Sequence, residues 1–236
     1  MLIYLDVETT GVEENDRICS IGIIVYDGSI TAYKELIKPP KKVRPEASAV
    51  HHITNEMLQA AKDFGSSEIK KILEKYNSLD TTIVGHNVVF DLNMLKYEGY
   101  HFKGAIIDTL KCSRSLMPEC EQFALQYLRY DLKLYKDEVS AATALGIKLK
   151  AHDALSDALH VRLLHQYLNT LAEDEKLLEL SVNPVLIQKL SFGKYKGRYI
   201  EEIVMNDISY LNWVLNSMDS LDEDLRHSIE YFMKML

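Results

Sequence analysis

The 236-residue sequence has only three cysteines, five prolines and one tryptophan. The three cysteines (Cys19, Cys112 and Cys120) are odd in number and form no Cys-x-x-Cys pair, so we expect neither a disulfide framework nor a zinc site. No apolar run approaches the ~20 residues of a membrane-spanning helix. The N-terminus shows no basic segment followed by an apolar stretch and a cleavage site. We therefore expect a cytoplasmic protein that does not enter a membrane.

Basic residues are fewer than acidic ones. The sequence has 27 Lys and Arg against 35 Asp and Glu, which gives a formal net charge of -8. This balance argues against a protein that coats nucleic acid through bulk positive charge. It does not argue against an enzyme whose acids belong to a metal site and whose basic residues are local. The length fits one large domain, or one domain and a small one.

The most informative stretch is residues 2–11 (LIYLDVETTG), an apolar, β-prone run that ends in a turn signal. Asp6 and Glu8 lie two residues apart, so on a strand both side chains project from one face. At ~4 Å and an effective dielectric of ~20, two carboxylates repel by roughly 4 kcal/mol, so a buried pair needs a cation or a retained proton. Alternatively, this end of the strand is exposed to solvent and both carboxylates are simply hydrated.

The expected elements indicate a mixed α/β sheet with helices packed against it. After the first strand we expect strands near residues 17–26, 30–37, 81–86 and 105–108, and helices near 55–62, 66–76, 90–97, 113–146 and 154–171. The domain is predicted to span residues 1–171, followed by a polar linker at 172–183. A small basic module is predicted over residues 184–236, with helices near 207–218 and 221–235.

Three further residues are candidates by position. Asp91 follows an expected strand at the first turn of a helix, where the helix dipole favours a carboxylate, although many helices begin with such an Asp. On a straight helix, residues five apart diverge by about 140°, so His152 and Asp157 face one pocket only if His152 precedes the helix. Alone, His152 fits a surface histidine and Asp157 an ordinary helix-start acid.

In combination, three motifs resemble those of the DnaQ-like 3'→5' exonucleases with the histidine variant of the active site (DEDDh). They are D-x-E-T-T-G from Asp6, H-N-x-x-F-D-x-x-x-L from His86 and H-x-A-x-x-D from His152. The other branch of the superfamily has a tyrosine where this chain has Asp153. The resemblance covers about residues 1–170 and implies an RNase H-like fold with a five-stranded sheet.

The resemblance also implies two-metal hydrolysis of phosphodiester bonds, with two Mg²⁺ or Mn²⁺ ions per active site. Asp6 is expected to bridge both ions, and Glu8, Asp91 and Asp157 to be ligands of one of them. His152 is the expected general base.

Weaker matches to the family concern residues that would contact the substrate. Thr9 is expected to present its backbone N–H to the terminal nucleotide, unless it is simply a strand-end turn residue. Residues 50–54 (VHHIT) resemble the family's V-H-G-I-T segment; His52 replaces the glycine, so only His51 is carried over. Asn87 and Phe90 match the second motif, where they would shape the pocket floor, although such a phenylalanine is often core.

Residues 190–199 (LSFGKYKGRY) form a second informative stretch, in which cations interleave with aromatic residues. Lys194, Lys196 and Arg198 would contact phosphates while aromatic rings stack on bases, as in single-strand binding surfaces. A hairpin with a solvated basic tip is the alternative. The motif F-G-K-Y-K-G-R, followed by residues 210–215, resembles the small C-terminal domain of exonuclease X-like enzymes, and we expect Trp213 to pack in its core.

The resemblance therefore implies a metal-dependent 3'→5' exonuclease that binds nucleic acid, most similar to the exonuclease X-like enzymes. It would release nucleoside 5'-monophosphates, with DNA ends in repair or end trimming as the expected substrate. Alternatives within the reaction class are an RNase T-like RNA-trimming enzyme and a polymerase proofreading subunit. The basic module argues against the proofreading subunit. A catalytically inactive nucleic-acid-binding scaffold is the alternative from another class. The oligomeric state is left open.

Overall fold

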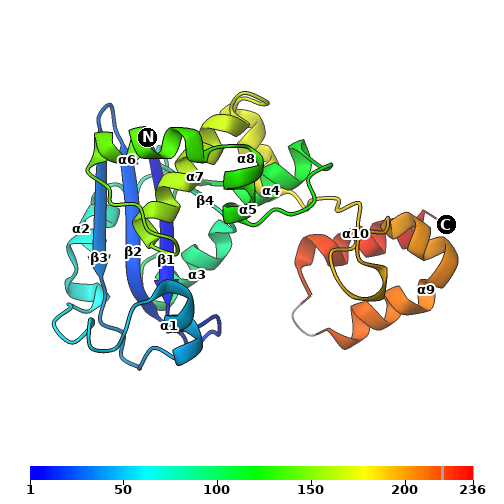
Figure 1. Cartoon of the computed structure of the whole chain (residues 1–236), viewed down its shortest axis with the longest axis horizontal. Helices are drawn as coiled ribbons and strands as arrows, with labels where there is room; N and C mark the ends of the chain where they lie inside the picture. Colours follow the sequence, from blue (N-terminus) through cyan, green and yellow to red (C-terminus); the bar gives the residue numbers. More distant parts are fainter. Residues whose placement is uncertain (219–220, 236) are drawn as a thin grey trace.

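The structure, a computed structural model, describes residues 1–218 and 221–235 and is built around one mixed sheet (Figure 1). The sheet has five strands in the order β3-β2-β1-β4-β5. Strand β1 pairs antiparallel with β2 and parallel with β4, which makes it the central strand. The strands are β1 (Leu2–Thr9), β2 (Ile18–Tyr26), β3 (Ile30–Leu36), β4 (Thr82–Gly85) and β5 (Ala105–Asp108). The predicted mixed five-stranded α/β sheet is confirmed.

Helices cover both faces of this sheet. In the first part of the chain they are α1 (Pro45–His51), α2 (Glu68–Lys75), α3 (Val88–Tyr97), α4 (Thr109–Leu116), α5 (Leu125–Asp131), α6 (Tyr135–Leu145), α7 (Ala154–Leu168) and α8 (Asp174–Val182). None of the helices in the described part of the chain is long and apolar enough to cross a bilayer.

Alternation along β1 decides which residues face the core and which face the site. Ile3, Leu5 and Val7 pack into one hydrophobic cluster, with residues of α2 and α3. Tyr4 packs on the opposite face, in the cluster that contains the buried residues of α7. Asp6 and Glu8 share the parity of Tyr4, so they project toward the α7 face, as the spacing of two predicts.

A close approach between helix and sheet brings α7 to these acids. Gly22 of β2 lies opposite Asp6 in the strand register. A Cβ at Gly22 would lie only 2.3–2.5 Å from backbone atoms of Ala154 and Leu155. Because glycine has no Cβ, the first turn of α7 rests directly on the sheet.

Two segments differ from the sequence-based expectation. Residues 55–62 form turns rather than a helix, because the Asn55 side chain bonds the backbone N–H and C=O of Val43 and ties the segment into a loop. The predicted linker at 172–183 is mainly helix α8, whose Leu177 is fully buried and whose Ser181 hydroxyl accepts the Asp108 N–H at 2.8 Å. The extended connection begins only after α8.

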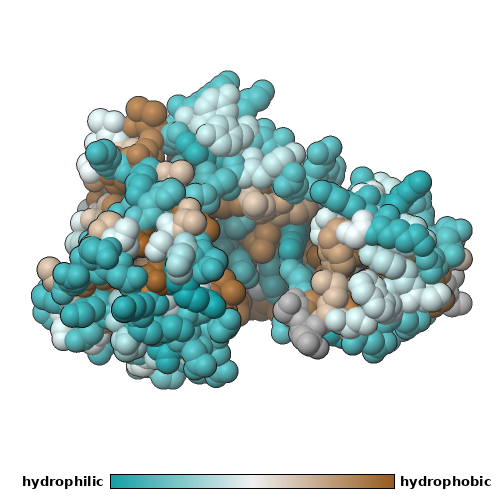
Figure 2. Space-filling view, turned by 60° about the horizontal axis from the view of Figure 1, so that its bottom comes forward, coloured by the Kyte–Doolittle hydropathy of each residue, from teal (hydrophilic) through white to brown (hydrophobic). Residues whose placement is uncertain are grey.

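The C-terminal module is a separate pair of helices, α9 (Ile200–Ser217) and α10 (Glu223–Lys234), with its own hydrophobic cluster (Figure 1). Asp207 has non-helical dihedrals inside α9, so the helix expected from residue 207 is the second half of a kinked one. Ion pairs join the module to α4: Arg114 contacts Asp222 and Asp224, each at 3.0 Å. Figure 2 shows a hollow between the main body and this module.

Candidate active site

Three carboxylates predicted from two separate motifs meet at the end of β1. Oxygen atoms of Asp6, Glu8 and Asp157 all lie within 4.8 Å of one another. Asp6 and Glu8 come from the central strand and Asp157 from the first turn of α7. They line a cavity of about 340 Å³, whose walls are Asp6, Val7, Glu8, His86, Ala124, Leu125, Gln126, His152 and Asp157.

Asp91 lies beside this group but is held differently. It is in the first turn of α3 and only 5% exposed, and its Oδ1 accepts the backbone N–H of Val7 at 3.0 Å. Among neighbouring carboxylates, the charge of Asp91 nonetheless contributes most to raising the pKa of Asp6. The structure therefore places all four predicted acids together, three around a common point and Asp91 beside them on the backbone N–H of Val7.

Burial and mutual repulsion disfavour the ionised forms of these acids. Burial, followed by the charges of Asp91 and Asp157, raises the pKa of Asp6 well above its ordinary value. Burial and the charge of Asp157 raise the pKa of Glu8 to about 7. A divalent cation would reverse this penalty, and a set of carboxylate oxygens fits Mg²⁺ or Mn²⁺ better than zinc.

His152 lies in the loop before α7, as the five-residue spacing to Asp157 requires. Its φ of 51° places it in the left-handed region, two residues before the helix begins. Asp153 caps the helix by accepting the Ser156 N–H and forms an ion pair with Lys34. The backbone turn at His152 and the cap at Asp153 together set the exposed imidazole at the cavity wall.

Thr9 and His51 contact each other next to the acids. Thr9 is 8% and His51 3% exposed. The Ile53 N–H donates to His51 Nδ1 at 3.0 Å, so the imidazole N–H is on Nε2, which lies 3.2 Å from the Thr9 carbonyl. This pair fixes the end of β1. His52 caps α1 at φ 62°, a left-handed conformation that explains why glycine suits this position in the related segment.

Residues of the second motif divide between surface and core. Asn87 is exposed, with φ 64°, at the N-cap of α3. Phe90 is half-buried and packs against the cluster under α3. The sequence reasoning missed Asp108, whose carboxylate accepts the N–H groups of Asn87 and Val88 and also caps α4. Its position at the end of an expected strand was the available signal.

Gln126 was also missed, although it lines the cavity. Its Nε2 donates to Oδ1 of Asp157 at 2.5 Å. His160, one turn further along α7, has Nδ1 3.2 Å from the same oxygen. The spacing of three between Asp157 and His160 on an expected helix was the sequence signal for this contact.

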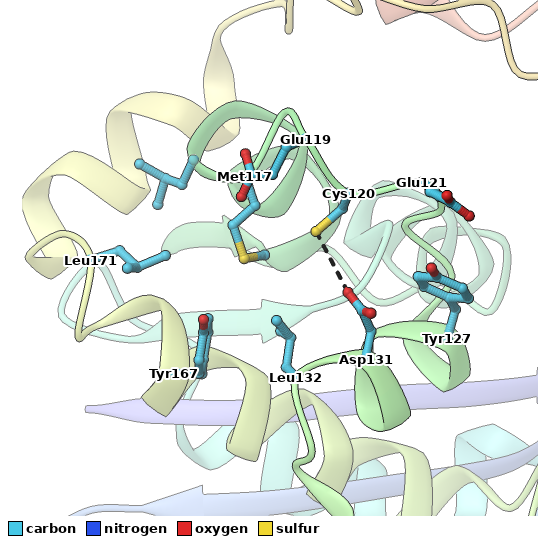
Figure 3. Close-up of a pocket in the computed structure, with 10 residues that line it drawn as sticks. Met117, Glu119, Cys120, Glu121, Tyr127, Asp131, Leu132, Tyr167 and Leu171 are labelled. Carbon is cyan, nitrogen blue, oxygen red and sulfur yellow. Dashed lines mark hydrogen bonds between the residues drawn. The ribbon is translucent and has the colours of Figure 1, made fainter. Parts of the chain in front are cut away.

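A larger cavity of about 500 Å³ lies on the other side of α5 and contains none of the predicted site residues (Figure 3). Met117, Leu132 and Leu171 form apolar walls, and Cys120 Sγ is 3.9 Å from a carboxylate oxygen of Asp131. It lacks the converging carboxylates that metal chemistry needs.

The basic residues of the C-terminal module are exposed but partly paired. Lys194 lies 3.1 Å from Asp207, and Arg198 lies 4.0 Å from Glu202. Lys196 has no ion-pair partner among the described residues. The expectation that Trp213 is a core residue is wrong, because it is 55% exposed. Helix α9 buries Leu211 and Val214 instead, which turns the intervening ring outward.

The exposed tryptophan belongs to a row of aromatic rings. Tyr195 and Tyr210 pack edge to face at 5.1 Å between ring centroids, and Tyr210 and Trp213 lie 5.8 Å apart. Lys194 lies 4.7 Å above the Tyr195 ring. Lys194 therefore shares one surface of the module with this row of aromatic rings.

Two family models match the chain. An exonuclease family matches residues 3–162, and an exodeoxyribonuclease X-like C-terminal family matches residues 190–218. Exodeoxyribonuclease 10 of Escherichia coli strain K12 is 29% identical over 239 residues, which cover 99% of each chain. A PolC-type DNA polymerase III of Thermotoga maritima is 31% identical over 166 residues, 66% of this chain and 11% of the polymerase.

Solved structures agree on the fold. Exonuclease X in complex with 5' overhanging duplex DNA superposes with a TM-score of 0.58 and 24% identity, over 77% of this chain and 99% of that one. E. coli exonuclease I with a dT13 oligonucleotide gives a TM-score of 0.53 and 19% identity, over 75% of this chain and 42% of that one. The predicted RNase H-like fold is confirmed. With its catalytic-domain match over residues 3–162 and its matching C-terminal domain, the chain belongs to the exonuclease family and carries an exonuclease X-like C-terminal domain.

Proposed function

We propose that this protein is a divalent-metal-dependent 3'→5' exodeoxyribonuclease that releases nucleoside 5'-monophosphates from DNA ends. The observation that carries the proposal is the convergence of Asp6, Glu8 and Asp157 within 4.8 Å, in a cavity also lined by His152. The full-length relative is an exodeoxyribonuclease, and two structural neighbours are complexes with DNA.

The residues divide the chemistry between them. Asp6, Glu8 and Asp157 would hold two Mg²⁺ or Mn²⁺ ions, with Asp91, which accepts the Val7 N–H, completing the set. Such ions, when bound, would polarise the scissile phosphate, activate the attacking water and stabilise the leaving 3'-oxygen. His152 accepts the proton of the attacking water, and its exposed position in a loop gives that proton a path to solvent.

Substrate contacts follow from the same geometry. Thr9 and His51 are buried and paired at the end of β1, directly after Glu8, and would support the place where the terminal nucleotide lies. Asn87 is exposed at the start of α3, whereas Phe90 is half-buried against the cluster under α3, from where it would support the pocket floor.

The C-terminal module would bind the strand upstream of the cleaved end. Lys194 lies over the Tyr195 ring, Lys196 and Arg198 are exposed in the residues that follow, and Trp213 adds a ring accessible to a base. Stacking of this kind tolerates any base sequence, which suits an enzyme that degrades DNA end by end. Trimming of DNA ends during repair in the cytoplasm is the cellular role we propose. An RNA-trimming enzyme is the competing assignment.

Digestion of matched DNA and RNA oligonucleotides tests the proposal. Substrates labelled at the 5' end, single-stranded or duplex, would be incubated with Mg²⁺ or Mn²⁺, with Asp6→Asn protein as the control. We expect a ladder of progressively shortened DNA and release of mononucleotides by the wild type alone. Faster digestion of RNA than of DNA would contradict the DNA assignment, and equal activity of Asp6→Asn would contradict the metal site.

A further inference from the structure

Four polar side chains from three helices form a closed circuit of contacts with Asp157. Gln126 and Arg129 come from α5, Glu138 from α6 and His160 from α7. None of them belongs to the three motifs that define the carboxylate set. We call these four residues the Asp157 ring.

The contacts run from Asp157 around the ring and back. Gln126 Nε2 donates to Asp157 Oδ1 at 2.5 Å, and Arg129 Nη1 donates to Gln126 Oε1 at 3.0 Å. Arg129 also binds Glu138 through two hydrogen bonds of 2.6 Å, from Nε and Nη2. Glu138 Oε2 lies 3.3 Å from His160 Nε2, outside hydrogen-bond geometry. His160 Nδ1, 3.2 Å from Asp157 Oδ1, closes the circuit.

Each contact constrains the next one. The guanidinium has only donors, so it fixes the Gln126 amide with its oxygen toward Arg129 and its NH₂ group toward Asp157. The planar, bidentate pairing with Glu138 in turn fixes Arg129. The two arms of the ring meet on a single atom, Asp157 Oδ1, whereas Oδ2 receives no hydrogen bond from any described residue.

Burial of so many polar groups is costly unless each is paired. Glu138 is 7% exposed, Asp157 7% and His160 2%. Apolar residues would pack the same space between α5, α6 and α7 at less cost. The ring is therefore better explained by what it does to Asp157 than by a contribution to stability.

We infer that the ring positions Asp157 as a metal ligand, because its two donors occupy Oδ1 and leave Oδ2 to the ion. This inference rests on the proposed metal site. Partners that orient a ligating carboxylate set both metal affinity and activity, and their loss typically costs ~10–100-fold. The ring residues do not themselves contact the ion or the substrate in this scheme.

The same helix provides a matched control. His165 is also buried, at 1% exposure, and lies in the last turn of α7, whereas Asp157 lies in the first; its Nε2 is 3.1 Å from Asp174. Mn²⁺ affinity of the metal-free full-length protein would be measured by titration calorimetry and electron paramagnetic resonance. The ring variants are His160→Leu, His160→Asn, Gln126→Ala and Arg129→Met, with His165→Leu and Asp157→Asn as controls.

We expect His160→Leu and Gln126→Ala to bind Mn²⁺ ~10–100-fold more weakly, and the Mg²⁺ concentration for half-maximal rate to rise by a similar factor. His160→Asn should recover most of the affinity, because its amide N–H can replace Nδ1–H. Arg129→Met, which does not touch Asp157, should also weaken binding, and His165→Leu should not. Gln126 is half-buried, so its variant keeps the test informative if His160→Leu does not fold.

The controls separate the two proposals. If Asp157→Asn binds Mn²⁺ like the wild type, the metal role of Asp157 fails, and the inference fails with it. If Asp157→Asn loses affinity while His160→Leu, Gln126→Ala and Arg129→Met retain it, the metal site stands and the positioning role is refuted. An equal loss in His165→Leu would assign the effect to the packing of α7 and also refute the inference.

Discussion

Removal of one charge from the carboxylate cluster should stabilise the metal-free protein. Burial and the charge of Asp157 raise the pKa of Glu8 from 4.5 to about 7. The folded state therefore binds this proton more tightly than the unfolded state does. Stability from this group is fully present below pH 4.5, is lost as the pH rises to about 7, and does not change further above that.

The size of the effect follows from the same two values. A difference between 4.5 and about 7 corresponds to ~3 kcal/mol at a pH above both. For a domain of ~150–250 residues, each kcal/mol changes Tm by ~2–4 °C, so Glu8→Gln should raise Tm by ~6–12 °C at pH 8. At pH 4 the carboxyl is protonated in both states, and the difference should nearly vanish.

Differential scanning calorimetry of the chelator-treated proteins at pH 4 and pH 8 measures this difference in Tm between wild type and Glu8→Gln. Saturating Mn²⁺ at pH 8 should raise the Tm of the wild type much more than that of Glu8→Gln, since the ion neutralises the charge that the variant lacks. Glu14→Gln, at an exposed position of the loop after β1, is the control and should change neither value. Equal Tm values for wild type and Glu8→Gln at pH 8 would refute the electrostatic reasoning.

Three further predictions concern catalysis and binding. His152→Ala should lower kcat by ~10²–10⁴-fold in Mg²⁺ while Mn²⁺ affinity measured by calorimetry stays near wild type, because the residue transfers a proton and holds no ion. Replacement of Lys194, Lys196 and Arg198 by alanine should weaken binding of single-stranded DNA in Ca²⁺ and flatten its salt dependence by up to ~0.7 in log–log slope per lost phosphate contact. Trp213→Ala should weaken the same binding by ~1–3 kcal/mol, measured by fluorescence anisotropy, through the loss of one stacked base.

Each of these tests has a control elsewhere on the chain. Lys70, Lys71 and Lys75 on α2 form a triplet for the charge test, and Tyr130 is an exposed aromatic residue of the catalytic domain, at 59% exposure. A salt slope equal to that of wild type in the C-terminal triple variant would remove the phosphate contacts from the proposal. Equal losses in Trp213→Ala and Tyr130→Ala would remove the stacking site, and loss of Mn²⁺ affinity in His152→Ala would make that residue structural.

Much of the sheet and the carboxylate set could be predicted because both depend on local rules. Alternation along β1 gives the faces of Asp6 and Glu8 without knowledge of any neighbour. The five-residue spacing between His152 and Asp157 excludes one straight helix, which leaves the loop where His152 is found. These predictions need only the geometry of a single element.

Errors arose where tertiary contacts overrode local signals. Residues 172–183 are acidic and polar, yet the acids at Glu173 and Asp174 favour a helix N-terminus, and Leu177 provides the buried face. Residues 45–51 were not among the expected helices, although proline is favoured in the first turn of a helix, where Pro45 begins α1. In both cases the same residue type permits two structures, and packing decides between them.

The Asp157 ring could not be predicted from the sequence, because its residues lie on three different helices. Its members are Gln126, Arg129, Glu138 and His160, and no spacing in the sequence connects α5, α6 and α7. Only the crossing of the three helices brings the side chains together. Trp213 was misplaced for a related reason, because its exposure depends on the rotation of the second half of α9 after the kink at Asp207.

Helix α4 connects the active site to the C-terminal module. It begins after Asp108, whose carboxylate holds the backbone N–H of Asn87 at the start of α3. Further along α4, Arg114 pairs with Asp222 and Asp224, and the Asp224 side chain is only 6% exposed, so this contact is better shielded from salt than a surface pair. The helix that aligns the second motif therefore also anchors the module. A strand bound by the module as proposed would be held by cations local to that module, which would let an acidic chain bind DNA beside an acidic site.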